Sequence, residues 1–118
     1  MKIYIDGAGY NGEISRAAIV LEDGRHEIRV TKADKTNNTM EYEALIYALE
    51  NYASKGDEIL CDSQLVVNQV TKDWKVNYEH LKELNKKARA LLDKKNVNLT
   101  WIPREKNKAG ILLEKGKI

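Results

Sequence analysis

The spacing of hydrophobic residues changes near residue 36, and this change constrains the fold more than any other feature of the sequence. Residues 2–6 alternate and include β-branched side chains, which is typical of a β-strand. Residues 14–22 and 26–32 flank Asp23-Gly24, a strong signal for a β-hairpin. We therefore expect the chain to begin with three antiparallel strands.

After residue 36 the hydrophobic residues follow a helical period. One helical stripe holds Met40, Ala44, Leu45, Ala48, Leu49 and Tyr52. Further helices are predicted at residues 63–70 and 78–95, and strands at residues 58–62 and 97–102. Residues 107–118 are predicted to form a short last helix, which Gly110 and Gly116 weaken.

This order of elements predicts an α/β fold in which residues 1–118 form a single domain. The last two strands each follow a helix, so crossover connections should make them parallel to a neighbour in the sheet. If the fourth strand pairs beside the first, the result is a five-stranded mixed sheet in the order 3-2-1-4-5, flanked by helices. Ligands should then collect at the switch between the first and fourth strands.

Composition limits the classes of protein that remain open. Cys61 is the only cysteine, so no internal disulfide can form. We find no signal peptide and no apolar run long enough for a membrane span, so we expect a cytoplasmic protein without a membrane partner. The second half of the chain is rich in lysine, which permits an anionic partner, although charge alone favours a solvated surface.

Three acidic residues from distant parts of the chain should meet at the switch in the predicted sheet. Asp6 and Asp62 follow the first and fourth strands, and Glu41 opens the long helix between them. Each has an ordinary alternative: a turn for Asp6, a capping box with Asn38 for Glu41, and a helix cap for Asp62. Together they favour chemistry, because clustered carboxylates repel one another unless cations neutralise them. Ligands of this kind suit two Mg²⁺ or Mn²⁺ ions, which can drive displacement at a phosphate.

Five segments follow one another along nearly the whole chain: YIDGAG, TNNTMEYEALIYALE, CDSQLVVNQV, DWKV and WIPREKNKAG. At this spacing the sequence resembles the ribonuclease H family, in the short bacterial and archaeal form that lacks an inserted basic handle. The resemblance implies a ribonuclease H-like fold and cleavage of the RNA strand of an RNA–DNA hybrid with two divalent ions. It also implies that Asp6, Glu41 and Asp62 are metal-binding catalytic acids. The positions that it implies for nucleic-acid binding are Gly7, Ala8, Thr36, Asn37, Asn38, Gln64, Trp74, Lys75 and Asn107.

The match to the family breaks at its fourth acid, which belongs to a pattern Asn-x-x-Ala-Asp-x-Leu. Alignment on Asn107 and Leu113 places Ile111 at the aspartate, and a shift of one residue places Gly110 there. Neither residue can bind a metal. Glu105 and Glu114 are nearby in sequence and could substitute for the missing acid, although we expect both to be solvated surface residues. The loop after the first strand is also shorter than is usual in the family.

These departures leave competing interpretations. The first is a ribonuclease that the missing acid weakens, in which Glu41 serves both as a helix cap and as a metal ligand. The second is a catalytically impaired module that binds RNA–DNA hybrid or duplex. We expect a monomer, and the alternative is a dimer through the C-terminal segment, where Leu112 and Leu113 could form an exposed apolar strip.

Overall fold

Five strands form one mixed sheet in the order β3-β2-β1-β4-β5, as the sequence predicts. The structure is a computed structural model that describes residues 1–115, so Gly116 and the end of the predicted last helix lie outside it. The elements are β1 (Lys2–Ala8), β2 (Ser15–Leu21), β3 (His26–Thr31), α1 (Asn37–Asn51), β4 (Glu58–Cys61), α2 (Gln64–Thr71), α3 (Glu79–Lys95), β5 (Asn98–Trp101), a 3-10 turn (Arg104–Lys106) and α4 (Lys108–Lys115).

Strand β1 lies at the centre of the sheet and carries the site. It pairs antiparallel with β2 and parallel with β4, and Ile5 lies opposite Cys61 in the parallel ladder. Asp6 and Asp62 are the next residues on the two strands, so the register places them side by side. Strand β1 continues to Ala8, because its ladder with β2 extends to that residue. The expected turn at Asp6-Gly7 is therefore wrong, since both residues belong to the strand.

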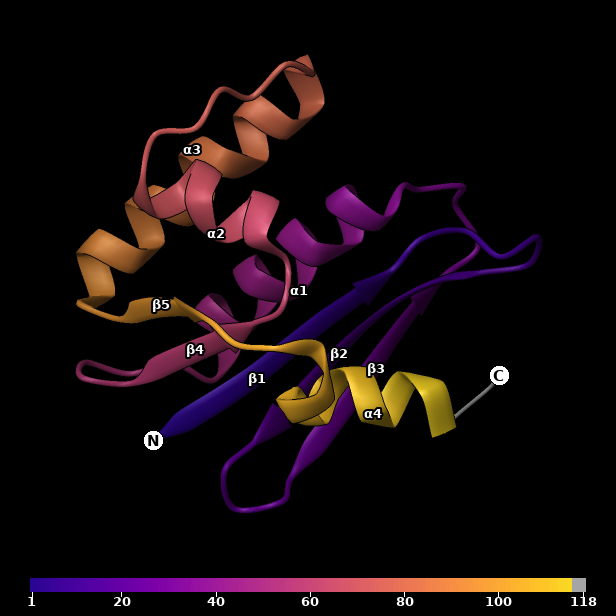
Figure 1. Ribbon diagram of the computed structural model, residues 1–118, viewed down its shortest axis with the longest axis horizontal. Coiled ribbons are helices and arrows are strands. Elements are labelled where there is room, and N and C mark those ends of the chain that lie inside the picture. The colour runs from indigo at the N-terminus through magenta and orange to yellow at the C-terminus, as the bar shows by residue number, and fades with distance from the viewer. Residues whose placement is uncertain (116–118) are drawn as a thin grey trace.

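Helices cover the two faces of the sheet unequally (Figure 1). The main core lies between the sheet and α1, α2 and α3, and its largest fully buried side chain is Tyr42. The opposite face carries a smaller core, in which Ala109 and Leu113 of α4 pack against Ala18 and Val20 of β2. The site lies at the end of β1, where α1 approaches from one face and α4 from the other.

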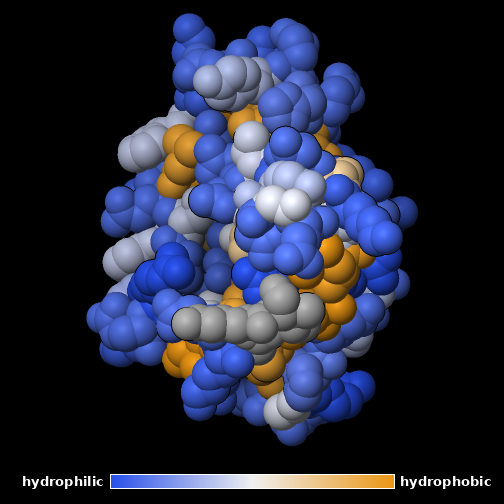
Figure 2. All heavy atoms as spheres, turned by 90° about the vertical axis from the view of Figure 1, so that its right-hand side faces the viewer, coloured by the Kyte–Doolittle hydropathy of each residue, from blue (hydrophilic) through white to orange (hydrophobic). Residues whose placement is uncertain are grey.

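The C-terminal apolar residues pack against the protein's own sheet. Leu113 is buried in the smaller core, and Leu112 is half-buried against it. The strip that motivated the dimer alternative is therefore covered within residues 1–115. Hydrophilic side chains predominate on the face shown in Figure 2, where hydrophobic ones gather only in patches. None of the described helices combines the length and the apolar composition that a membrane crossing requires.

Helix α1 begins two residues earlier than a cap at Asn38 would allow. Thr36 is the N-cap, and its hydroxyl accepts a hydrogen bond from the backbone N–H of Thr39 at 3.1 Å. Glu41 lies in the second turn, and its carboxylate accepts a hydrogen bond from the N–H of Gly7 on β1 at 3.1 Å. The predicted capping box is therefore wrong, which leaves the Glu41 carboxylate at the sheet edge.

Gly7 allows α1 and β1 to approach this closely. A Cβ atom added to Gly7 would lie 2.3 Å from the backbone nitrogen of Glu41, well inside any real van der Waals contact. A larger residue at this position would push α1 away from the strand. The glycine thus brings the Glu41 carboxylate within reach of Asp6.

Candidate active site

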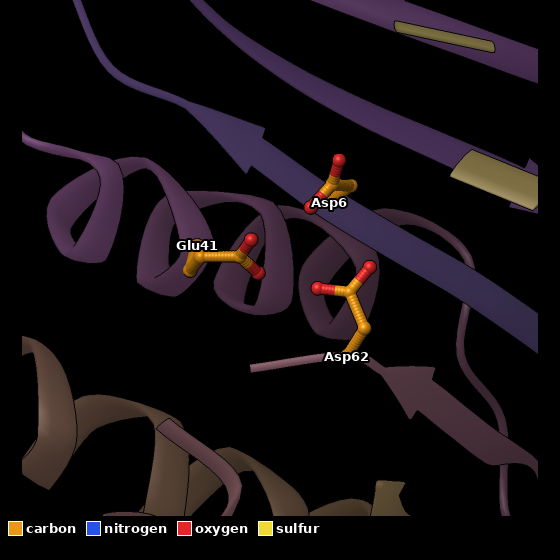
Figure 3. A group of neighbouring side chains, drawn as sticks. All are labelled: Asp6, Glu41 and Asp62. Atoms are coloured by element: carbon orange, nitrogen blue, oxygen red, sulfur yellow. The ribbon is translucent and has the colours of Figure 1, made fainter. Parts of the chain in front are cut away.

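Three carboxylates meet at the carboxyl ends of β1 and β4 (Figure 3). Asp6 comes from β1, Glu41 from α1, and Asp62 from the residue that follows β4. Each offers one carboxylate oxygen, and these oxygens all lie within 4.8 Å of one another. Asp6 and Glu41 are each 6% exposed, and Asp62 is half-buried. The convergence expected from the sequence is therefore present.

Neighbouring groups fix the orientation of two of these acids. Asn107 donates hydrogen bonds from Nδ2 to the Asp62 carboxylate and to the backbone carbonyl of Ile5, both at 2.9 Å. The indole N–H of Trp101 donates to the backbone carbonyl of Asp62 at 3.0 Å. The Cys61 thiol lies 3.5 Å from the second carboxylate oxygen of Glu41. These contacts hold the acids in place without neutralising their charge.

The side chain of Asn107 forms its hydrogen bonds within the protein. It is fully buried, and its Oδ1 accepts a hydrogen bond from the N–H of Ala109, while Nδ2 bonds Asp62 and Ile5. Asn107 joins α4 to β1 and bonds Asp62, and its assignment as a binding residue stays a prediction. A buried amide satisfies all of its groups in this way when it orders a site.

The electrostatics of the cluster favour a bound cation. Burial, then the hydrogen bond and charge of Asp6, raise the pKa of Glu41 to about 9. Burial also raises the pKa of Asp6, although the Arg104 guanidinium acts in the opposite direction. Clustered acids with raised pKa values are poised to exchange protons for a metal. The ligand set consists of oxygens alone, which fits Mg²⁺ or Mn²⁺ and not a soft metal.

The structure distinguishes the two candidates for the position of the missing fourth acid. A Cβ atom added to Gly110 would lie 3.3 Å from an Asp6 carboxylate oxygen and 3.5 Å from one of Asp62. Ile111 is 37% exposed, and it lines a separate pocket with Arg104, Glu105, Gly110 and Glu114. Gly110 therefore faces the cluster, and the alignment shifted by one residue describes the site.

Of the remaining positions implied for nucleic-acid binding, the structure brings four into one cleft with the acids. Asn37 accepts a hydrogen bond from the N–H of Gly9 at 2.6 Å, so its amide connects α1 to the loop after β1. Gly7, Ala8, Asn37 and Asn38 line one cleft of about 380 Å³ with Asp6 and Glu41. Thr36, Gln64, Trp74 and Lys75 are exposed at the ends of α1 and α2, and Trp74 is 50% exposed.

The sequence interpretation missed two arginines. Arg16 on β2 and Arg104 in the 3-10 turn line the same cleft as the acids. Arg16 lies opposite Ala8 in the β1–β2 ladder, and that register was the available signal. Arg104 begins the 3-10 turn three residues after the end of β5, whose last residue, Trp101, pairs with Cys61 beside the site. Both bring positive charge to a cleft that otherwise carries carboxylates.

Comparison with known proteins identifies the family to which this fold belongs. The model of a protein family described as RNase H matches residues 1–110. The chain belongs to the RNase H family. Two curated relatives of this RNase H chain are the bifunctional protein Rv2228c of Mycobacterium tuberculosis, 34% identical, and ribonuclease HI of Halobacterium salinarum, 39% identical. These matches cover 85% and 88% of the chain, but only 28% and 57% of the two relatives.

Solved structures of RNase H proteins share this fold. The crystal structure of the Halobacterium salinarum RNase H1 is 34% identical, with a TM-score of 0.72 over 95% of this chain and 92% of that one. LC11-RNase H1 in complex with an RNA/DNA hybrid is 31% identical, with a TM-score of 0.70 over 99% of each chain. The order of the strands and the helices on both faces therefore belong to the family.

The raised pKa of Glu41 predicts how the stability of the metal-free RNase H chain depends on pH. The carboxyl is neutral in the folded state up to about pH 9 but ionises in the unfolded chain near its ordinary value of 4.5. Its contribution to stability is therefore complete below pH 4.5 and is lost as the pH rises toward 9. Glutamine does not ionise, so between these pH values Glu41→Gln should lose less free energy of unfolding than the wild type, by on the order of 1 kcal/mol or more.

Thermal unfolding in a chelator at pH 5 and at pH 9 measures this effect. The wild type should lose more stability than Glu41→Gln between the two pH values, and added Mg²⁺ should stabilise only the wild type. An equal loss in both proteins would contradict the assignment of a neutral Glu41 in the metal-free state.

Proposed function

We propose that this chain is a metal-dependent endonuclease that hydrolyses the RNA strand of RNA–DNA hybrids. The observation that carries the proposal is the convergence of three carboxylate oxygens within 4.8 Å, at the joined ends of two parallel strands. Family membership and the RNA/DNA hybrid bound in the structure of LC11-RNase H1 support the choice of substrate.

In this proposal, Asp6, Glu41 and Asp62 hold two Mg²⁺ or Mn²⁺ ions. Bound ions would activate the attacking water and stabilise the charge that develops on the phosphate. The chain's own groups position the acids: Gly7 holds Glu41 through its backbone N–H, and Asn107 holds Asp62. Binding of the ions requires the release of protons from Glu41 and Asp6, so metal affinity should rise with pH.

Selection of a hybrid requires contacts to both strands. The 2′-hydroxyls of RNA lie along a wide minor groove, where amide and backbone groups can bind them. We assign this role to Asn38 and Gln64, and the DNA strand to the group Thr36, Asn37, Trp74 and Lys75. Gly7 and Ala8 would lie against the ribose at the cleaved position.

Gly110 makes this active site one carboxylate short, so we propose that activity is weakened relative to a four-acid enzyme. Mn²⁺ should support faster cleavage than Mg²⁺, because Mg²⁺ dehydrates reluctantly and requires near-ideal octahedral ligands. The same glycine favours a second candidate function, a module that binds hybrid without cutting it.

A cleavage assay separates the two candidates. We expect cleavage of a labelled RNA strand in an RNA–DNA hybrid, in Mn²⁺ and more slowly in Mg²⁺, and none in a chelator. The same RNA alone and in an RNA–RNA duplex should survive under the same conditions. Salt-dependent binding of the hybrid without cleavage in either metal would favour the binding module.

A further inference from the structure

We propose that Glu114 supplies the carboxylate that Gly110 lacks, and that it does so from one turn further along α4. This inference rests on the proposed metal-dependent function. It concerns a residue outside the fourth-acid position of the family pattern, one that the sequence alone presents as a solvated surface acid.

The first observation is the close approach of Gly110 to two of the acids. The ideal Cβ position of Gly110 lies 3.3 Å from Asp6 Oδ2 and 3.5 Å from Asp62 Oδ2, and no side chain of its own fills that direction. Gly110 is nevertheless buried, so neighbouring groups close over the position. Gly110 therefore adjoins Asp6 and Asp62 without supplying a ligand of its own to an ion that those acids would hold.

The second observation is the position of Glu114 on the helix. Glu114 follows Gly110 by four residues in α4, so the two lie on the same face, about 6 Å apart along the axis. Side chains on an α-helix lean toward its N-terminus and cover the preceding turn. The Glu114 side chain therefore leans over Gly110, and its extra methylene lengthens its reach by about 1.5 Å relative to aspartate.

The third observation is that Glu114 shares the cleft with the acids. It lines the cleft of about 380 Å³ together with Asp6, Glu41, Gly110 and Arg104. Arg104 lines this cleft as well, and its guanidinium lies 3.7 Å from the Glu114 carboxylate. Glu114 and Asp6 therefore share a cationic neighbour in the metal-free protein.

The pair between Arg104 and Glu114 leaves the glutamate free to move. Both side chains are largely exposed, 70% and 67%, and ion pairs of this kind contribute little to stability. A divalent ion beside Asp6 and Asp62 would attract Glu114 more strongly than a single solvated guanidinium does. Glu114 can thus exchange Arg104 for the metal at small cost.

Glu105 provides a matched control within the same region. It lies in the 3-10 turn and lines the neighbouring pocket with Ile111, but it does not line the cleft that holds Asp6 and Glu41. Glu105→Gln and Glu114→Gln remove the same charge from nearby surface positions. If only the overall charge matters, both substitutions should weaken metal binding equally. If Glu114 is a metal ligand, only Glu114→Gln should weaken it.

The experiment measures Mn²⁺ affinity by isothermal titration calorimetry and by the metal-induced rise in Tm, on the whole chain. We expect Glu114→Gln to weaken binding at the weaker of the two metal sites by about tenfold, and Glu105→Gln to change it less than about twofold. Glu114→Asp should resemble Glu114→Gln, because the shorter side chain cannot span the turn. The Tm values in a chelator verify that the variants are folded.

A double-mutant cycle that combines Gly110→Asp with Glu114→Gln tests directly whether Glu114 takes the place of the missing acid. If Glu114 fills the place of the missing acid, its replacement should have almost no effect once an aspartate stands at position 110. Equal Mn²⁺ affinity of the wild type and Glu114→Gln, or an unchanged effect in the Gly110→Asp background, would overturn the inference. Absence of Mn²⁺ binding by the wild type would instead overturn the proposed function.

Discussion

Asp6→Asn is expected to reduce hybrid cleavage by about a thousandfold or more, equivalent to roughly 4 kcal/mol of transition-state stabilisation. Asp6 belongs to the centre of the cluster, because its carboxylate lies within 4.8 Å of those of Glu41 and Asp62 and 3.3 Å from the ideal Cβ position of Gly110. Asparagine preserves the shape of the side chain but removes the charge that would hold the ions. Single-turnover cleavage of a labelled hybrid in saturating Mn²⁺ measures the loss.

The same substitution should stabilise the protein in the absence of metal. Burial raises the pKa of Glu41 most, and the charge of Asp6 adds to it; removal of that charge relieves this added contribution, so Tm in a chelator should rise. Asp93→Asn serves as the control, since Asp93 is exposed on α3 and lines a cleft that lacks the three acids. Cleavage by Asp6→Asn at the wild-type rate would show that these acids do not take part in the reaction.

Gly110→Asp is expected to increase hybrid cleavage by about tenfold, a gain of roughly 1.4 kcal/mol in the barrier. Position 110 faces Asp6 and Asp62, so an aspartate there adds a fourth carboxylate to the cluster. The backbone of Gly110 is helical, which an aspartate can adopt at no cost relative to glycine. Metal affinity should rise with the rate, while Tm in a chelator should fall because another acid joins the repulsion.

Ile111→Asp is the matched control for this gain. Ile111 follows Gly110 on α4, but Ile111 lines a different pocket and is partly exposed to solvent. Its substitution should leave the cleavage rate near that of the wild type. A gain from Ile111→Asp and none from Gly110→Asp would show that the unshifted alignment on Asn107 and Leu113 describes the site.

The sheet and its order could be predicted because local pattern and topology agree. The alternating segments, Asp23-Gly24 and the helical stripe through Leu45 each determine an element, and the rules for crossovers leave few ways to join them. The meeting of Asp6 and Asp62 followed from the same reasoning, because adjacent parallel strands end at the same edge of a sheet. Helix spacing alone then placed Glu41 near that edge.

Details that depend on single contacts could not be predicted in this way. Thr36, Asn37 and Asn38 are all good N-cap residues, so the sequence could not choose among them, and packing of α1 on Gly7 decides for Thr36. The sequence presents Asn107 only as an implied nucleic-acid-binding position, and its hydrogen bond to the carbonyl of Ile5 on β1 could not be predicted.

The register of the last segment shows the same limit. It depends on how the 3-10 turn after Pro103 feeds α4, and a shift of one residue exchanges Gly110 for Ile111 at the cluster. Sequence pattern alone left both alternatives open.

A crystal structure of the protein soaked in Mn²⁺ tests the central claim most directly, because anomalous scattering locates the ions without assumptions. The account predicts Mn²⁺ within about 2.5 Å of carboxylate oxygens from Asp6, Glu41 and Asp62. Anomalous peaks elsewhere on the surface, with Glu41 still bonded to Asp6 and Gly7 at a concentration of Mn²⁺ that supports cleavage, would contradict it.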